Sequence, residues 1–254
     1  MGRFDLSGKV AVVTGGNGGI GFGMARGLAE AGCAIVVAAR NADKSARAVR
    51  ELRGLGVKAD AVAVNVADEQ AVGRLIEGTA REFGRLDIVI NNAGTNIRKP
   101  PQDLTLDEWH HVMDTNLTSA FLVSKAAYPH LKRQGGGKII NIGSMMSIFG
   151  VRFSPAYAPS KGGIVQLTKV LATAWAADNI QVNAVLPGWI DTELTQGARK
   201  QVEGLHDSVL RRTPAGRWGT IDDMAGVAVF LAGPGSDFVT GTAIPVDGGY
   251  SIQG

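Results

Sequence analysis

Seven short runs of apolar, mostly β-branched residues recur along the chain, and each predicts a strand. They span residues 9–14, 34–39, 61–66, 86–92, 137–144, 180–187 and 241–249. Most of these runs are continuously apolar, which is typical of strands that helices cover on both faces. Longer stretches with the periodicity of amphipathic helices separate them. This alternation predicts an α/β fold, a doubly wound Rossmann-type parallel sheet of about seven strands with helices on both faces.

Three of the helical stretches carry recognisable end signals. The helix after the first strand ends at Gly32, since glycine is common just beyond a helix. The stretch 67–84 begins with Asp68, a favourable N-cap, and ends at Gly84. Residues 105–137 predict one long helix that stops at a triple glycine. These signals support the placing of helices between the predicted strands.

No linker rich in Pro or Ser, no shift of composition and no internal repeat divides the chain. Residues 1–254 are therefore expected to form a single dinucleotide-binding catalytic domain. The stretch 188–219 is the least regular, because it is long, polar and interrupted by glycine and proline. We expect it to form a substrate-binding loop or lid within this domain.

Composition narrows the range of partners. The 26 basic and 23 acidic residues give a net charge of +3, and the basic residues are scattered in short clusters. This pattern predicts no nucleic-acid partner. The single cysteine, Cys33, excludes an intrachain disulfide and fits a reducing, cytoplasmic setting. No run approaches ~18 apolar residues and the start lacks a signal core, so we expect no membrane segment.

A glycine-rich turn, "VVTGGNGGIGFG", follows the first strand directly and opens the first helix. Its Gly15, Gly19 and Gly21 suit a tight turn, because glycine accepts positive φ values and has no Cβ. The helix N-terminus behind the turn presents free N–H groups to a pyrophosphate. Strand before and helix after are the context that favours a dinucleotide site over a purely structural turn.

The end of the second strand bears on the choice of cofactor. An acidic residue there would bind the 2′-hydroxyl of NAD, whereas an arginine can pair with the 2′-phosphate of NADP. The chain has "VVAARN", with Arg40 and no acid. A guanidinium suits a phosphate well, so the sequence favours NADP(H). An ordinary surface charge at Arg40 remains the alternative.

The segment "YAPSK" places Tyr157 and Lys161 one helical turn apart. Tyrosine titrates near pH ~10, and a neighbouring ammonium lowers that pKa, which makes the phenol a usable general acid/base. Pro159 lies between the two and is tolerated only in the first turn of a helix. Tyr157 is therefore expected at the start of a helix, at the carboxyl edge of the sheet.

With these motifs in order, the whole chain resembles the short-chain dehydrogenase/reductase (SDR) family. The segments that carry the resemblance are "TGGNGGIG" at 14–21, "NNAG" at 91–94, Asn116, Ser144, "YAPSK" at 157–161 and "PGWIDT" at 187–192. The resemblance implies an NAD(P)(H)-dependent oxidoreductase that interconverts a secondary alcohol and a ketone by hydride transfer.

The same resemblance implies four catalytic residues. Tyr157 would be the acid/base at the substrate oxygen, and Ser144 would hydrogen-bond that oxygen. Lys161 would bind the nicotinamide ribose and lower the pKa of Tyr157. Asn116 would hold a water that extends the proton relay from Lys161.

The resemblance also implies a cofactor site in the turns after the strands. Its expected members are Gly15, Asn17, Gly19, Ile20, Gly21, Arg40, Asn65, Val66, Asn92, Ala93, Gly94, Tyr157, Lys161, Pro187, Gly188, Ile190 and Thr192. Asn65-Val66 replaces the family's common acid-Val pair at the adenine. Gly18 stands where NADP-preferring relatives often have a second basic residue, so NAD(H) stays an alternative to NADP(H).

Four further segments bear on the substrate, namely "NAGTNIRKP", "INIGSMMS", "PAGRWG" and "DFVTGTAIPVDGG". They are similar to the branch of gluconate and 2-deoxygluconate dehydrogenases, which implies a sugar acid or polyol. Arg98 and Arg152 are then the candidates for binding the substrate carboxylate. An apolar wall would instead favour a 3-oxoacyl thioester or a hydrophobic ketone. The residues that suggest this wall are Met145, Met146, Phe149, Phe153 and Trp189.

Other classes of function stay open or are excluded. Some relatives lose the catalytic residues and act as cofactor-sensing regulators, which the intact set in this chain argues against. The histidines show no ligand spacing with Cys or acidic residues, so we expect no metal. They are His110, His111, His130 and His206. The family resemblance implies a homotetramer, whose only predicted partner is a small-molecule substrate.

Overall fold

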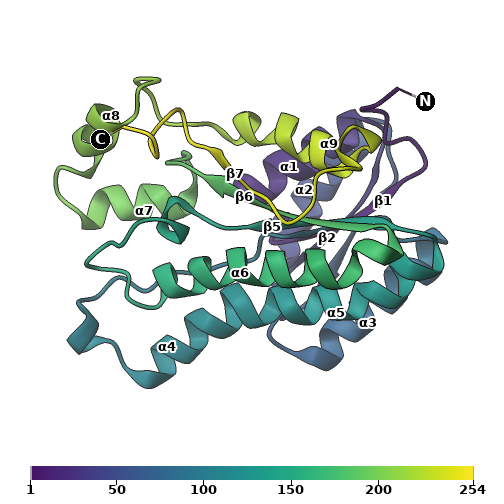
Figure 1. The fold of residues 1–254 in the computed structure, drawn as a ribbon, viewed down its shortest axis with the longest axis horizontal. Helices are drawn as coiled ribbons and strands as arrows, with labels where there is room; N and C mark the ends of the chain where they lie inside the picture. Colours follow the sequence, from purple (N-terminus) through teal and green to yellow (C-terminus); the bar gives the residue numbers. More distant parts are fainter. Residues whose placement is uncertain (1, 254) are drawn as a thin grey trace.

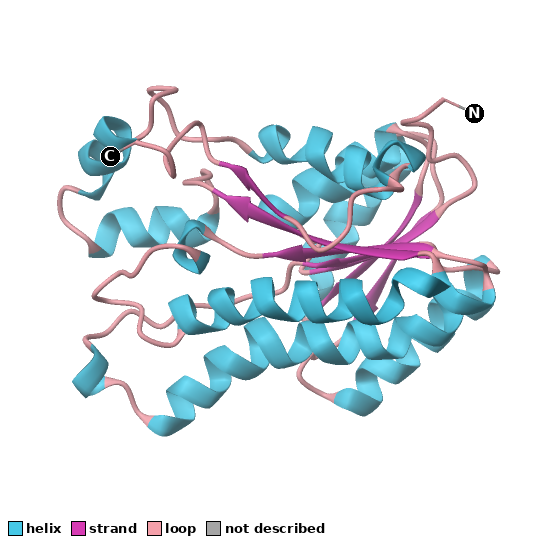
Figure 2. Ribbon diagram, viewed as in Figure 1, coloured by secondary structure: helices cyan, strands magenta, loops and turns pink. Residues whose placement is uncertain are grey.

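Seven parallel strands form the centre of the molecule in a computed structural model that describes residues 2–253 (Figures 1 and 2). Their order is β3-β2-β1-β4-β5-β6-β7, and every neighbouring pair is parallel. The strands are β1 Val10–Thr14, β2 Ala34–Ala39, β3 Ala59–Ala63, β4 Ile88–Asn91, β5 Gly137–Ile142, β6 Ile180–Pro187 and β7 Ala243–Val246. The predicted doubly wound parallel sheet is confirmed.

Helices cover both faces of this sheet. On one face α1, α2 and α9 pack against the strands, and on the other lie α3, α5 and α6, with α4 beside α6 (Figure 1). The helices are α1 Gly19–Glu30, α2 Ala42–Gly54, α3 Glu69–Phe83, α4 Leu106–Met113, α5 Ser119–Arg133, α6 Tyr157–Trp175, α7 Glu193–Gln201, α8 Leu205–Arg212 and α9 Ala225–Ala232. The arrows of β6 and β7 point toward α7 and α8, which therefore lie beyond the carboxyl edge of the sheet.

The strands divide the apolar core into two halves. In β1, Ala11 and Val13 face the cluster under α1 and α9, whereas Val12 faces the cluster under α3 and α5. Each residue of β1 is thus buried, whichever face of the sheet its side chain points to. This double burial explains why the strand runs are continuously apolar.

Several predicted boundaries differ from the structure for physical reasons. The third strand ends at Ala63, because it pairs only with β2, whose own last residue is Ala39. The last strand is confined to β7 between turns at Gly241 and Gly248, both of which have positive φ. The predicted end signals at Asp68 and Gly84 are confirmed, since Asp68 caps α3 and Gly84 adopts the left-handed conformation.

The long helix predicted for residues 105–137 is interrupted. A π-helical turn at Asp114–Thr118 separates α4 from α5. It carries Asn116, whose side chain bonds to segments outside the helix. A π turn widens the helix by one residue, often at functional sites, so tertiary contacts here override the regular helical pattern.

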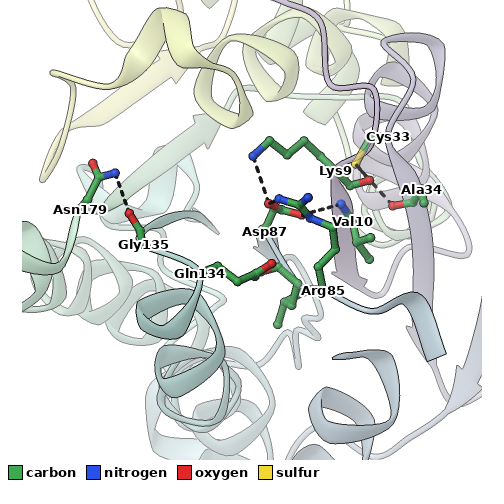
Figure 3. A network of polar contacts seen from close by, with 10 residues as sticks. Lys9, Val10, Cys33, Ala34, Arg85, Asp87, Gln134, Gly135 and Asn179 are labelled. Carbon is green, nitrogen blue, oxygen red and sulfur yellow. Dashed lines mark hydrogen bonds and ion pairs between the residues drawn. The ribbon is translucent and has the colours of Figure 1, made fainter. Parts of the chain in front are cut away.

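A charged network ties the amino ends of the central strands together (Figure 3). Asp87, just before β4, accepts hydrogen bonds from Lys9 Nζ at 3.1 Å, from the Val10 amide at 3.0 Å and from Arg85 Nε at 2.7 Å. Cys33 lies beside this network, fully buried, with Sγ 3.4 Å from the Lys9 carbonyl oxygen. Burial raises the pKa of the Cys33 thiol well above its ordinary value.

No helix within residues 2–253 is both long and apolar enough to span a bilayer.

Candidate active site

A cavity of about 710 Å³ lies at the carboxyl ends of the strands. Turns that follow six different strands contribute to its wall, with Gly15, Arg40, Asn65, Asn92, Ser144 and Gly188 as one member from each. In an open parallel sheet, ligands bind at this edge, where the order of the strands reverses on either side of β1. Of the site residues that the sequence predicted, including those of the alternative apolar wall, all except Gly21, Asn116, Phe149 and Arg152 line this cavity.

The glycine-rich turn is shaped to bring backbone close to a ligand. Gly15 and Gly19 have φ values of 64° and 53°, which residues with a Cβ rarely adopt. Gly18 caps α1 without any side-chain hydrogen bond, and the first turn of α1 holds no acidic residue. The N–H groups of that turn are thus left for an anion. This cradle fits the pyrophosphate of a dinucleotide.

Gly21 lies behind the cavity wall, where it allows close packing of the glycine-rich turn. A Cβ on this residue would collide with Asn92 Nδ2 and would lie 2.6 Å from the Gly15 carbonyl oxygen. Asn92 in turn donates from Nδ2 to the Thr14 carbonyl oxygen at 3.0 Å. The Thr14 hydroxyl accepts the backbone N–H of Asn92 at 2.9 Å and that of Ala93 at 3.0 Å. Thr14 therefore fixes the turn, a role that sequence reasoning missed although this residue directly precedes the glycines.

The far end of the cavity is basic. Arg40 lines it, is exposed, and has no hydrogen-bond or ion-pair partner within residues 2–253. Asn17 donates from Nδ2 to Ser45 Oγ at 3.1 Å, which joins the glycine-rich turn to α2. Asn65 and Val66 lie in the same part of the wall, where the adenine of a dinucleotide was expected. Lys44, which the sequence did not single out, also lines this end.

The other end of the cavity holds the predicted reacting groups. Tyr157 is the first residue of α6, so Pro159 falls within the first turn and needs no N–H donor, as predicted. Lys161 lies 4% exposed, and its Nζ donates to the Ile142 carbonyl oxygen at 2.7 Å. The same Nζ is 5.7 Å from the centre of the Tyr157 ring. The expected placing of the two side chains on one helix face is thereby met.

Ser144 follows β5 and begins a short 3₁₀ turn at Met145–Ser147. Its hydroxyl accepts the Met146 amide at 3.1 Å, which orients it in the cavity wall. Ser147 donates to the Lys161 carbonyl oxygen at 2.7 Å. This bond joins the serine turn to α6, so Ser144 and Tyr157 are held on one rigid unit.

Asn116 lies behind these groups, 2% exposed. Its Nδ2 donates to the Thr95 carbonyl oxygen and to Ser160 Oγ, both at 3.0 Å, and its Oδ1 accepts the Thr95 amide at 2.8 Å. A Cβ on Gly94 would lie 3.4 Å from this Oδ1 and 3.7 Å from Lys161 Nζ. Asn116 and Lys161 thus border the same glycine, although Asn116 does not reach the cavity surface.

Burial shifts the pKa values of Tyr157 and Lys161 at the reacting end of the cavity. It raises the pKa of Tyr157, while the Ser144 side chain and the charge of Arg98 act in the opposite direction. Burial lowers the pKa of Lys161 to about 8. The charge of Arg98 therefore opposes the raised pKa of the phenol, in addition to Lys161, the cation that the sequence pointed to.

Arg98 reaches the cavity from the loop after β4. Its Nη1 donates to Gln201 Oε1 at 3.1 Å and its Nη2 to the Leu194 carbonyl oxygen at 3.3 Å. No carboxylate pairs with it within residues 2–253, and burial lowers its pKa. Arg152, the other candidate for a substrate carboxylate, is exposed and lies outside the lining, because its neighbours Val151 and Phe153 are the residues that turn inward.

The stretch 188–219 is more regular than the sequence suggested, since it contains α7 and α8. Trp189, Ile190, Thr192 and Leu194 from this stretch line the cavity. A small apolar cluster of Ala198, Leu205, Val209 and Trp218 holds the two helices together. Across the described part of the chain, no group of three or more His, Cys, Asp or Glu side chains is placed to hold a metal ion.

Comparison with known proteins agrees with this geometry. The family model described as "Enoyl-(Acyl carrier protein) reductase" matches residues 15–251. The chain belongs to the short-chain dehydrogenase/reductase family. The resemblance drawn from its motifs is thereby confirmed, and this SDR chain is an NAD(P)-dependent oxidoreductase of the alcohol dehydrogenase and ketoreductase type.

Similar members of the family share nearly its whole length. The chain is 41% identical over 251 residues to 2-dehydro-3-deoxy-D-gluconate 5-dehydrogenase of Escherichia coli strain K12, covering 98% of each chain. It is 38% identical over 250 residues to gluconate 5-dehydrogenase of Gluconobacter oxydans, covering 98% of this chain and 97% of the other. A solved gluconate 5-dehydrogenase of Burkholderia cenocepacia, in complex with NADP and tartrate, has a TM-score of 0.93 and 42% identity over 98% of both chains.

Proposed function

We propose that this protein uses NADP(H) to interconvert a secondary alcohol and a ketone on a sugar acid. The observation that carries the proposal is Arg98, a cation without a carboxylate partner in the described chain, placed in the same cavity as Tyr157 and Ser144. A substrate carboxylate would supply the missing partner. The related Burkholderia enzyme, solved with NADP and the hydroxy acid tartrate, supports this choice of ligands.

In this proposal the residues that line the cavity from its basic end to Tyr157 would hold the cofactor. The glycine-rich turn and the N-terminus of α1 would hold its pyrophosphate, and Arg40 would pair with its 2′-phosphate. Pro187, Gly188, Ile190 and Thr192 line the cavity and would contact the nicotinamide. When bound, the nicotinamide supplies or accepts the hydride. NAD(H) remains the alternative, distinguished by direct comparison of the two cofactors.

The chain's own residues handle the proton and the substrate oxygen. The Tyr157 phenol donates a proton to the carbonyl oxygen in reduction and accepts it from the alcohol in oxidation. Its raised pKa keeps it protonated at neutral pH, and the charges of Arg98 and Lys161 favour its ionised form when the proton leaves. The Ser144 hydroxyl donates a hydrogen bond to the same oxygen and orients it.

Asn116 is proposed to support the proton relay. Both of its N–H donors are bonded to protein, and one lone pair of Oδ1 is used by the Thr95 amide. An amide oxygen has two lone pairs, so Oδ1 retains one acceptor position for a water near Lys161. Through this water, Lys161 would return the proton that Tyr157 gives up.

The cavity wall also supports a polyol. Asn96 donates from Nδ2 to Ser154 Oγ at 3.0 Å, while its buried Oδ1 has no partner among residues 2–253. A substrate hydroxyl could donate to this oxygen, because buried acceptors are normally satisfied. Met146 and Trp189 add apolar wall to the same cavity. We propose Arg98, Asn96, Met146 and Trp189 as the substrate contacts.

The test compares substrates and cofactors directly. Purified protein is assayed with D-gluconate or 2-dehydro-3-deoxy-D-gluconate and NADP⁺ or NAD⁺, and with an acetoacetyl thioester and NADPH. We expect the sugar acids and the phosphorylated cofactor to give the higher kcat/KM. Faster turnover of the thioester would overturn the sugar-acid proposal in favour of an apolar site built around Met145, Met146 and Phe153, which also line the cavity.

Variants test the residues. Tyr157→Phe should lower kcat by about 10²–10⁴-fold, the range for loss of a general acid/base, while its Kd for NADPH stays near that of the wild type. Arg98→Gln should raise the KM for the sugar acid, whereas Arg152→Gln, an exposed arginine of equal charge, should not. Cofactor binding with no turnover of any substrate would favour a regulator that senses the cofactor.

We further propose that residues 1–254 act as one catalytic domain, with 188–219 as the lid, and that four chains assemble into a homotetramer in the cytoplasm. The single buried cysteine supports a reducing compartment. Large apolar side chains are exposed on the outer elements, namely Leu106, Phe121, Val170 and Phe238, which supports assembly. Light scattering after gel filtration would give the mass, and a monomer would contradict the homotetramer.

A further inference from the structure

Lys44 occupies the position of the basic side chain that the glycine-rich turn lacks. It lies in the first turn of α2, on the helix that follows Arg40, and both residues line the basic end of the cavity. A Cβ on Gly18 would lie 2.6 Å from Lys44 Cε and 2.8 Å from its Nζ. The ammonium group therefore covers the bare glycine from a different element, in the space that a longer side chain at position 18 would need.

In the structure this ammonium binds a residue of the lid. Lys44 Nζ donates to Glu193 Oε2 at 2.7 Å. Glu193 is the first residue of α7 and itself lines the cavity, beside Thr192. The bond therefore connects the start of α2 to the start of the lid helix across the basic end of the cavity.

This ion pair is easily exchanged. The Glu193 side chain is 82% exposed and that of Lys44 is 28% exposed, and an exposed ion pair contributes little stability. A phosphate dianion carries more charge than one carboxylate and offers three acceptor oxygens. Arg40 lines the same cavity and has no ion-pair partner within residues 2–253, so Lys44 would complete a two-cation site for such a group.

We propose that Lys44 exchanges Glu193 for the 2′-phosphate of NADP(H). Resting on the NADP(H) function proposed above, this makes Lys44 a specificity residue for the phosphorylated cofactor. It also makes Glu193 a competitor whose release loosens the first turn of α7. NAD(H), which has no 2′-phosphate, leaves the link between Lys44 and α7 in place.

The test measures the Kd of two cofactor fragments by calorimetry. Adenosine 2′,5′-bisphosphate carries the 2′-phosphate, and adenosine 5′-monophosphate lacks it. Lys44→Gln should weaken the bisphosphate about tenfold and the monophosphate less than twofold. Glu193→Gln should strengthen the bisphosphate severalfold, because the competitor is gone. The control Arg50→Gln removes one charge from an exposed position on the same helix, outside the cavity lining, and should change neither.

Two other results would overturn the role of Lys44, and a third would overturn the NADP(H) function. Equal weakening of both fragments by Lys44→Gln would overturn the proposal, because the lysine would then act on the shared 5′-phosphate. Weaker binding of the bisphosphate to Glu193→Gln would also overturn it, since Glu193 would then hold Lys44 in place for the ligand. If neither fragment binds the wild type, the proposed NADP(H) function itself fails.

A second readout tests the lid. Hydrogen exchange of the α7 amides in the wild type should be faster with the bisphosphate than with the monophosphate. In Glu193→Gln the two ligands should give equal rates, because the link to Lys44 is already absent. Equal rates in the wild type would contradict the release of α7.

Discussion

At the reacting end of the cavity, the pKa of each ionisable side chain depends on how deeply the side chain is buried. Within residues 2–253, the Lys161 ammonium has a single hydrogen-bond partner, the Ile142 carbonyl oxygen, and the residue is only 4% exposed. Arg98 is partly buried and reaches the phenol of Tyr157 by its charge. The ease with which the phenol ionises therefore depends on two cations, of which Arg98 belongs to the substrate side. A bound carboxylate would neutralise Arg98 and keep Tyr157 protonated, as reduction of a ketone requires.

The residues of this end were predictable from sequence, but their charges were not. "YAPSK" identifies Tyr157 and Lys161, and their helical spacing follows from the four-residue interval. Their pKa values depend on burial, which the segment does not encode. Lys44 was missed for a similar reason: its proximity to Gly18 results from the packing of α2. Its place in the first helical turn after Arg40 was the available signal.

Lys161→Met should change how stability depends on pH. In the folded chain the pKa of Lys161 is lowered to about 8 from 10.5, so between these values the unfolded chain binds more protons. The free energy of unfolding of the wild type should rise with pH across this window, by roughly 3 kcal/mol relative to the variant. Denaturant unfolding of both proteins without cofactor, at pH values from 7 to about 10.5, measures the difference.

Parallel stability curves for the two proteins would contradict a lowered pKa. The comparison removes the effect of the other lysines and tyrosines, because they titrate in both chains.

Among the elements, those set by local signals were predicted and those set by contacts were not. Asp68 and Gly84 delimit α3 because capping is local. The π turn at Asp114–Thr118 depends instead on bonds from Asn116 to Thr95 and Ser160, in other segments. The helices α7 and α8 are short and polar, so their packing on Trp218 decides their structure more than their periodicity does.

Close packing of α1 gives a prediction with an internal control. A Cβ on Gly23 would collide with the Ile221 carbonyl oxygen, which is backbone and cannot rotate away. Gly23→Ala should therefore lower the free energy of unfolding by about 1–3 kcal/mol, as overpacked sites do. Gly73 lies inside α3, and a Cβ added to it would meet no atom within 4 Å, so Gly73→Ala should raise the free energy of unfolding by about 0.5–1 kcal/mol.

Chemical denaturation of both variants measures this contrast. Stabilisation by Gly23→Ala would show that α1 and the segment around Ile221 can separate without loss. Unchanged stability in Gly73→Ala would mean that α3 is limited by its contacts and not by helix propensity.

Across the whole molecule, the candidate active site and the charged network around Asp87 lie at opposite edges of one sheet. The cavity lies at the carboxyl edge, and the network around Asp87 lies at the amino edge (Figure 3). The charged residues of this network do not line the cavity; they are Lys9, Arg85 and Asp87. The parallel direction of all strands produces this separation, because every strand begins at one edge and ends at the other. That much was predictable from the alternation of strand and helix.

Asp87→Asn should therefore lower stability without changing catalysis. The Asp87 side chain is 7% exposed and pairs with two cations, so loss of its charge should cost about 1–3 kcal/mol. The control Asp60→Asn breaks a 4.0 Å pair with Arg53 whose side chains are 52% and 60% exposed, and should change stability by less than about 0.5 kcal/mol. Thermal unfolding and kcat/KM per folded molecule are the two measurements, and a drop in kcat/KM for Asp87→Asn would contradict the separation of the edges.

Cys33 gives this chain a built-in probe of its own opening. It is the only thiol in the sequence, is fully buried, and directly precedes β2, beside the Asp87 network. A thiol reagent reacts with the thiolate. In the folded chain the reagent cannot reach the buried sulfur, and the raised pKa of the thiol keeps the thiolate scarce. The rate of alkylation then reports how often the centre of the sheet opens. It does not respond to movements of α7 and α8. A single native residue thus distinguishes rupture of the scaffold from the motions that substrate exchange requires.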